Sequence, residues 1–190
     1  MKLIHLAFAG LLCLAAFAGS AFAASDDNTM TIQLKDGPVV IELMPDVAPK
    51  HVAQIKALAA KGAYDNVAFH RVIDGFMAQT GDVRYGNLNK GFDPERVGTG
   101  GSDLPNIPAE FSKVPFERGT VGMARASDPD SANSQFFIMF DDGPSLNGNY
   151  TVVGKVVSGM ELVDKIKRGD GQNGEVTDPD RMVKVTVGKQ

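Results

Sequence analysis

The stretch Phe69-His-Arg-Val-Ile-Asp-Gly-Phe-Met-Ala-Gln-Thr-Gly-Asp82 says more about the fold than any other part of this 190-residue sequence. Two short runs of alternating apolar and polar residues lie on either side of Asp74-Gly75, a dipeptide typical of tight hairpin turns. Alternation places Arg71 on one strand face with Phe69 and Ile73. An arginine in such surroundings is costly unless its charge is exposed or hydrogen-bonded. From the residues alone, Arg71 is either half of a surface ion pair or a functional group.

A second hairpin and several further strands are predicted on both sides of this stretch. Residues 28–35 and 39–43 alternate around Asp36-Gly37, which indicates two strands with one buried face. In another run, alternation turns Phe136 toward the core and away from the face that carries its neighbour Phe137. The runs of the hairpin around Asp74-Gly75 span 68–73 and 76–79, and the remaining strand-like runs lie at 120–124, 136–140, 151–157 and 181–187.

Two helices are expected between the strands. The first follows Asp46, which can cap it, and ends at Gly62. The second opens with the capping box Ser158-Gly-Met-Glu161 and ends at Gly169. About eight short strands and two helices, with no repeat or linker, predict one mainly β domain. We expect a closed antiparallel β-barrel of about eight strands capped by two α-helices, since closure leaves no exposed strand edge.

The N-terminal 23 residues have the pattern of an export signal. Lys2 gives a basic start, residues 3–17 form an apolar run, and Ala21-Phe-Ala23 is a small-residue cleavage pattern. The apolar run is shorter than the ~20 residues of a membrane-spanning helix, although a retained anchor is an alternative. We expect cleavage after Ala23, a periplasmic location, and a single folded domain over residues 24–190 with no membrane attachment.

The charge and residue types of that domain exclude several function classes. Cleavage removes Lys2 and no acid, so the formal charge goes from −4 to −5, which argues against nucleic acid or an anionic membrane as a partner. It also removes Cys13 and leaves only His51 and His70 as soft metal ligands. We expect no metal and no cofactor, and a monomer.

Several polar segments are interpreted as loops without chemistry. Asp128-Pro-Asp130 lacks the later Gly and Glu of a calcium loop. Gly98-Thr-Gly-Gly101 lacks the Lys-Ser/Thr and the following helix of a phosphate-binding loop, so it is predicted to be flexible. The acids in other loops are expected to serve solvation; these are Asp82, Glu110 and Asp141-Asp142.

Three blocks of the sequence resemble the cyclophilin family of peptidyl-prolyl cis/trans isomerases. The first is the stretch from 69 to 82. The second runs from Gly119-Thr-Val-Gly-Met-Ala-Arg to Ser134-Gln-Phe-Phe-Ile138, and the third is Leu146-Asn-Gly-Asn-Tyr-Thr-Val-Val-Gly-Lys-Val156. The resemblance covers about Thr31 to Val187 in the same order. It implies a cofactor-free isomerase whose partners are unfolded or partly folded Pro-containing polypeptides.

The resemblance also implies roles for individual side chains. The implied catalytic residues are Arg71, Gln79, which orients it, and Phe76. The side chains implied to receive the proline ring are Phe76, Met77, Phe137 and Leu146. Those implied to hold the residues before the proline are Ala124, Arg125, Ala126 and Gln135.

Two positions depart from the family pattern at the edge of the proline pocket. Ser145 stands where many members carry Trp, and Tyr150, which we still place in the substrate-binding set, stands where many carry His. Ser145 offers a shorter donor and less apolar area than an indole. The expected consequence is weak binding of cyclosporin A with turnover largely preserved. His70 belongs to the motif but is interpreted as structural.

The implied chemistry suits a chain without a nucleophile, because rotation about an X-Pro bond makes and breaks no covalent bond. A guanidinium can donate a hydrogen bond to the prolyl nitrogen as amide resonance is lost. The alternative is a chaperone module that grips Pro-containing segments with little turnover. Arg71 and Gln79 favour the enzyme, because a binding module needs only the apolar wall.

Overall fold

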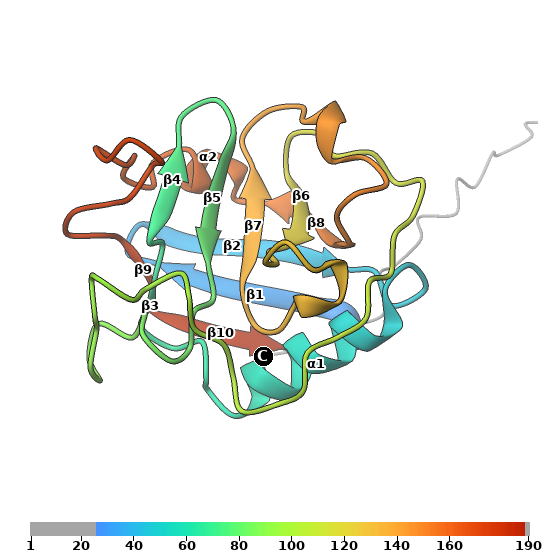
Figure 1. Cartoon of the computed structure of the whole chain (residues 1–190), viewed down its shortest axis with the longest axis horizontal. Coiled ribbons are helices and arrows are strands. Elements are labelled where there is room, and N and C mark those ends of the chain that lie inside the picture. The colour runs from blue at the N-terminus through green and yellow to red at the C-terminus, as the bar shows by residue number, and fades with distance from the viewer. Residues whose placement is uncertain (1–25, 189–190) are drawn as a thin grey trace, which may run out of the picture.

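A computed structural model describes residues 26–188, and the predicted signal segment and its cleavage site lie outside the described residues. The fold is mainly β, as predicted (Figure 1). The strands are β1 (Thr29–Leu34), β2 (Gly37–Leu43), β3 (Val67–Ala68), β4 (Arg71–Ile73), β5 (Met77–Thr80), β6 (Thr120–Met123), β7 (Phe136–Met139), β8 (Val152–Ser158), β9 (Arg181–Met182) and β10 (Lys184–Val187). The helices are α1 (Pro49–Ala60) and α2 (Met160–Val163), with short 3₁₀ turns η1 (Asp26–Asn28), η2 (Pro129–Ser131) and η3 (Pro144–Leu146).

Eight strands form one antiparallel sheet in the order β10-β1-β2-β8-β6-β7-β5-β4. The sheet curls strongly, so that β4, β5 and β7 run at a steep angle to β1, β2 and β10 in Figure 1. The predicted closed barrel is wrong, because the described edge strands β4 and β10 do not pair and the sheet is an open half-barrel. The separate ribbon of β3 and β9 lies at this opening, with Val67 opposite Met182. β3 ends just before β4 begins, and β9 ends just before β10 begins. The two short strands pair with each other in a separate ribbon, whereas a closed barrel would require β4 to pair with β10.

Both predicted hairpins are present. Asp36-Gly37 joins β1 to β2 with Leu34 opposite Gly37, and Asp74-Gly75 joins β4 to β5 with Ile73 opposite Met77. Gly75 has a φ of +67°, a left-handed conformation that costs a glycine little. This turn is the local reason why Arg71 and Gln79 become direct cross-strand partners.

The first helix lies where it was predicted, but its cap differs. Ala48, not Asp46, is the N-cap residue, and no side chain within the turn caps the helix. Instead the carboxylate of Glu110, 59 residues further along the chain, accepts the backbone N–H of His51 at 3.1 Å and also that of Lys50. The interpretation of Glu110 as loop solvation is therefore wrong, because its charge satisfies the free N–H groups at the start of α1.

The second helix is much shorter than predicted. Ser158 is still the last residue of β8, paired with Val40, so it cannot act as the first residue of a capping box. Gly159 is the N-cap with a φ of +83°, and a Cβ there would lie 2.5 Å from the carbonyl oxygen of Pro38. Only Met160–Val163 is α-helical. The close approach of Gly159 to β2 therefore accompanies a helix start one residue later than the predicted capping box.

The apolar side chains form two clusters. The large one fills the space between the curled sheet and α1, and it contains Phe136, which is fully buried as predicted and meets Tyr64 edge-on. The small cluster gathers side chains of β5, β7 and β8 with one from the loop before β6; its buried members are Met77, Phe116, Phe137, Met139 and Val152. This second cluster supplies the floor of the site described next.

Candidate active site

The β4–β5 hairpin presents Arg71 at the rim of a pocket of about 210 Å³. Its Nε donates to the carbonyl oxygen of Asn173 at 2.8 Å, and its Nη1 donates to Gln79 Oε1 at 3.3 Å. Gln79 in turn donates through Nε2 to Gln135 Oε1 at 3.0 Å. Within residues 26–188, no carboxylate lies within ion-pair distance of Arg71. The surface ion pair that the residues alone allowed is therefore not formed, and the guanidinium is held by neutral acceptors.

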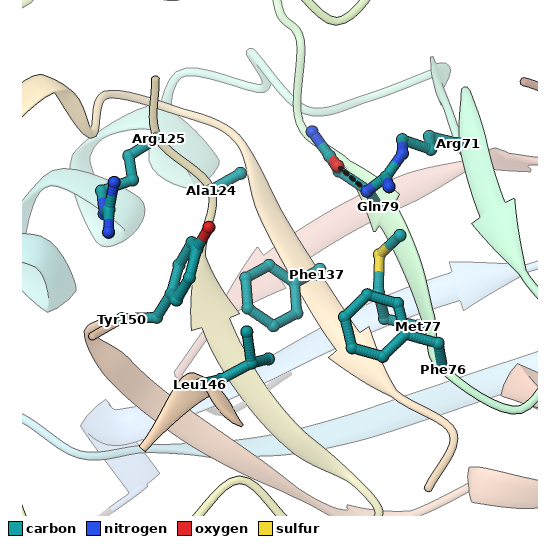
Figure 2. Close-up of a pocket in the computed structure, with 9 residues that line it drawn as sticks. All are labelled: Arg71, Phe76, Met77, Gln79, Ala124, Arg125, Phe137, Leu146 and Tyr150. Atoms are coloured by element: carbon teal, nitrogen blue, oxygen red, sulfur yellow. Dashed lines mark hydrogen bonds between the residues drawn. The ribbon is translucent and has the colours of Figure 1, made fainter. Parts of the chain in front are cut away.

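The floor and walls of the pocket are apolar and come from separate parts of the chain. Figure 2 shows Met77 beneath Arg71, with Phe76 at the near edge and Phe137 in the centre. Leu146, from η3, closes the lower side. Phe137 is buried, so most of its ring belongs to the protein interior and only a face is presented to the pocket. The result is a small apolar cup with a charged donor at its rim.

Aromatic contacts hold this cup rigid. Phe116 stacks on Phe137 with ring centroids 5.8 Å apart, and Tyr150 meets Phe137 edge-on at 5.9 Å. Both geometries are favourable for aromatic pairs. Sequence analysis missed Phe116, because it lies in an irregular segment outside the three motif blocks and carries no periodic signal of its own.

Arg125 supports the wall opposite Arg71. Its guanidinium lies 4.5 Å from the ring centroid of Tyr150 and donates to the carbonyl oxygens of Ala126 and Asn149. In Figure 2 Tyr150 stands between Arg125 and Phe137. The contact is a cation–π interaction, so the Arg125 side chain stabilises the position of the Tyr150 ring.

A second hollow, the polar hollow, is lined by polar and small residues and continues from the pocket. It shares Gln79, Ala124 and Arg125 with the first pocket, and it adds Ala126 and Gln135. The structure thus brings all predicted site residues into one continuous surface. Nine of them line the first pocket: Arg71, Phe76, Met77, Gln79, Ala124, Arg125, Phe137, Leu146 and Tyr150. Ser145 lies next to this set in η3 and is exposed.

The Gly98–Gly101 segment is ordered by the side chains beneath it, so the prediction of a flexible loop is wrong. Gln135 Nε2 donates to the carbonyl oxygens of Gly98 and Gly100 at 3.0 and 2.7 Å. The N–H groups of the same two glycines donate to Asp82 Oδ2 at 2.7 and 2.9 Å. Asp82 Oδ1 accepts the N–H groups of Arg84 and Tyr85. Asp82 is fully buried, so its interpretation as a solvating acid is wrong as well.

His70 is buried beside this loop, in keeping with a structural role. Burial is the main cause that lowers the pKa of His70 to about 4, with the charge of Arg71 acting in the same direction and Asp82 against it. The imidazole is therefore neutral near pH 7. It carries no charge that would compete with the Arg71 guanidinium for an electron-rich substrate atom.

Burial would raise the pKa of the Glu110 carboxyl group, but its hydrogen bonds with His51 and Lys50 outweigh burial and hold this pKa below its usual value. The carboxylate lies 2.6 Å from His51 Nδ1. In the described part of the chain no group of three or more His, Cys, Asp or Glu is placed to hold a metal ion. The same residues include no helix long and apolar enough to cross a membrane.

Comparison with known proteins identifies the family. Residues 29–187 match the family model described as cyclophilin type peptidyl-prolyl cis-trans isomerase/CLD. The chain belongs to the cyclophilin family. This cyclophilin is 68% identical over 169 residues to a probable peptidyl-prolyl cis-trans isomerase of Brucella suis, an overlap of 88% of the chain and 86% of the relative. It is 41% identical over 140 residues to peptidyl-prolyl cis-trans isomerase B of Bacillus subtilis, covering 72% of the chain and 89% of that protein.

Solved structures of cyclophilins are also similar to this chain. A cyclophilin from Hirschia baltica superposes with a TM-score of 0.72 at 27% identity, over 86% of this chain and 75% of that one. A cyclophilin type isomerase of Cryptosporidium parvum, crystallised in the presence of the dipeptide Ala-Pro, has a TM-score of 0.72 at 28% identity, over 85% and 99% of the two chains. This cyclophilin is therefore an enzyme that catalyses peptidyl-prolyl cis/trans isomerisation.

Proposed function

We propose that this enzyme isomerises X-Pro bonds in exported polypeptides and that Arg71 is its catalytic residue. The observation that carries the assignment is the position of the Arg71 guanidinium, held by neutral acceptors at the rim of an apolar cup. The cup, formed by Phe76, Met77, Phe137 and Leu146, takes the proline ring. Direct measurement of cis/trans exchange in a short Xaa-Pro peptide, with catalytic amounts of purified protein, tests the activity at this site.

The mechanism follows from the electronic structure of the amide. Rotation about X-Pro faces a barrier near 20 kcal/mol because the nitrogen lone pair is delocalised into the carbonyl group. In the twisted state the lone pair returns to nitrogen, which becomes a hydrogen-bond acceptor. Arg71 donates to that nitrogen, so the interaction forms only as the transition state is reached. The cup fixes the ring, and the preceding carbonyl group rotates.

The polar hollow beside the cup takes the residues that precede the proline. Ala124, Ala126 and Gln135 line this hollow, and Gln79 lies between it and Arg71. An extended substrate segment laid along it would place its proline in the cup. The alternative function, a chaperone module with little turnover, would use the same surface. The hydrogen-bonded pair Arg71–Gln79 favours catalysis, since retention of a peptide in an apolar cup requires neither side chain.

We also propose that the enzyme is exported to the periplasm, where it acts as a monomer that assists protein folding. The basic start, apolar run and Ala21-Phe-Ala23 pattern of the sequence support export. Fractionation of the producing bacterium, followed by mass determination, should find a chain that starts at Ala24 in the periplasmic fraction. A chain with residues 1–23 intact in the cytoplasm would contradict the proposal.

Cyclosporin A should inhibit this enzyme weakly, and Ser145→Trp should strengthen inhibition about thirtyfold. An indole N–H adds one net hydrogen bond of ~0.5–1.5 kcal/mol and its ring adds about 1 kcal/mol of apolar contact. The sum of about 2 kcal/mol corresponds to roughly thirtyfold in affinity. Ser145 is exposed beside Leu146 in η3, so a larger side chain can be added without disturbing the core.

Inhibition titrations of the wild-type protein, Ser145→Trp and the control Ser145→Ala provide the measurement. Turnover of a short Xaa-Pro peptide should change little in all three proteins, since Ser145 does not line the cup. An unchanged inhibition constant in Ser145→Trp would mean that residue 145 does not border the drug.

A further inference from the structure

The segment from Gly169 to Val176 lies along the free edge of β4. The N–H of Gly169 donates to Val72 O at 2.8 Å, and the N–H of Val72 donates to Gly174 O at 2.7 Å. Val176 N–H donates to the carbonyl oxygen of His70 at 3.1 Å. These bonds bring the tip of the segment beside the Arg71 side chain, which projects from the same strand.

Asn173 at that tip is the nearest hydrogen-bond partner of Arg71. Its carbonyl oxygen accepts from Arg71 Nε at 2.8 Å, a shorter contact than the 3.3 Å between Arg71 Nη1 and Gln79. The side of the guanidinium that carries Nε is thereby fixed, while Nη donors remain for the substrate. The orientation of Arg71 thus depends on where the carbonyl group of Asn173 points.

Glu175 holds the backbone N–H and the side-chain amino group of Asn173. Its Oε2 accepts the backbone N–H of Asn173 at 3.0 Å, and its Oε1 accepts from the side-chain Nδ2 at 3.0 Å. Hydrogen bonds, above all the one from the Asn173 side chain, keep the pKa of Glu175 below its usual value. The group is therefore anionic near neutral pH, and it accepts both bonds at full strength.

The carboxylate of Glu175 accepts hydrogen bonds from Asn173 and not from the guanidinium of Arg71, and this difference matters for catalysis. A carboxylate bonded to the guanidinium itself would compete with the prolyl nitrogen for the same N–H donors. A backbone carbonyl group is a weaker acceptor and occupies only Nε. The arrangement keeps Arg71 fixed in direction and still able to donate.

We propose that Glu175 is a positioning residue for the isomerisation: by fixing Asn173, it directs the guanidinium of Arg71 toward the proline cup. This inference rests on the proposed catalytic role of Arg71. Glu175 is the antiparallel bridge partner of Arg71 on the edge of β4, but it lines neither the cup nor the polar hollow, so it makes no substrate contact of its own.

The test compares Glu175→Ala and Glu175→Gln with a carboxylate of the same segment. Asp170 Oδ1 accepts the N–H and the hydroxyl of Thr177, both at 3.2 Å, and does not contact Asn173. Glu175→Ala should lower kcat about tenfold with KM changed by less than about twofold, because orientation and not binding is lost. Glu175→Gln should recover about a third of the wild-type kcat, since its single amide oxygen can still accept one of the two bonds. Asp170→Ala should keep kcat within about twofold.

Hydrogen exchange of the Arg71 Nε–H group, followed by NMR and assigned by its disappearance in Arg71→Lys, gives a second readout. It should speed up at least about fivefold in Glu175→Ala and stay unchanged in Asp170→Ala, because only the first loses the fixed acceptor. Normal kcat in Glu175→Ala, a loss confined to KM, or an equal loss in Asp170→Ala would overturn the inference. If Arg71→Ala keeps wild-type turnover, the proposed catalytic role of Arg71 is wrong. If Arg71→Ala loses turnover while the Glu175 variants keep it, only the positioning role of Glu175 is wrong.

Discussion

Replacing Arg71 by alanine should lower kcat/KM for a short Xaa-Pro peptide about 10²–10³-fold, the scale of losing one preorganised transition-state donor. Affinity for the same peptide should fall much less, because the apolar cup that receives the proline ring stays intact. Arg71 is only half-buried, and its two hydrogen-bond partners, Asn173 and Gln79, can bond to water in its absence. The protein should therefore remain folded.

The measurement is cis/trans exchange at several peptide concentrations, together with peptide affinity and the thermal midpoint. Arg181→Ala is a matched control, since that exposed guanidinium donates to Asn89 and lies outside the site. Near-normal turnover in a folded Arg71→Ala protein would remove Arg71 from the mechanism. Wild-type binding of peptide without measurable wild-type turnover would instead support the chaperone alternative.

The parts of the site that could be predicted from the sequence are those encoded by local patterns. Asp74-Gly75 between two alternating runs is enough to predict a hairpin, and its register then makes Arg71 and Gln79 neighbours. Alternation likewise separates Phe136, which is buried in the large core, from Phe137, which reaches the pocket. In both cases the relevant residues are within a few positions of each other, so no long-range information is needed.

Contacts between distant loops could not be predicted in this way. Glu110 caps α1 across 59 residues, and Asn173 holds Arg71 across 102 residues. A carboxylate in a polar loop has the same sequence appearance whether it is solvated or buried against backbone N–H groups. The prediction of a closed barrel was wrong for a related reason. The strands can be predicted from the alternating sequence, but the pairing of β3 with β9 outside the main sheet depends on tertiary packing.

Among the loop acids that are buried against backbone N–H groups instead of solvated, Asp82 should contribute most to stability. We expect Asp82→Ala to lower the free energy of unfolding by about 3 kcal/mol. The substitution leaves the N–H groups of Arg84, Tyr85, Gly98 and Gly100 without their acceptor, and each buried unsatisfied donor costs ~1–3 kcal/mol. The total stays below the sum of four donors because the glycine loop can move outward and bond to water.

The same change should lower kcat/KM about tenfold, because the loop carbonyl groups of Gly98 and Gly100 anchor Gln135, which holds Gln79 beside Arg71. Asp82→Asn should be intermediate, since an amide can accept on one side but presents N–H donors to the other pair of N–H groups. Asp103→Ala is the control: this carboxylate also belongs to the loop region, but it is fully exposed, and Arg84 is its only bonded partner among residues 26–188, so its loss should change stability by less than about 0.5 kcal/mol. Urea unfolding of the three variants decides the matter. Wild-type stability in Asp82→Ala would show that the four N–H groups find other acceptors, and the ordering of the glycine loop would then have to come from Gln135 alone.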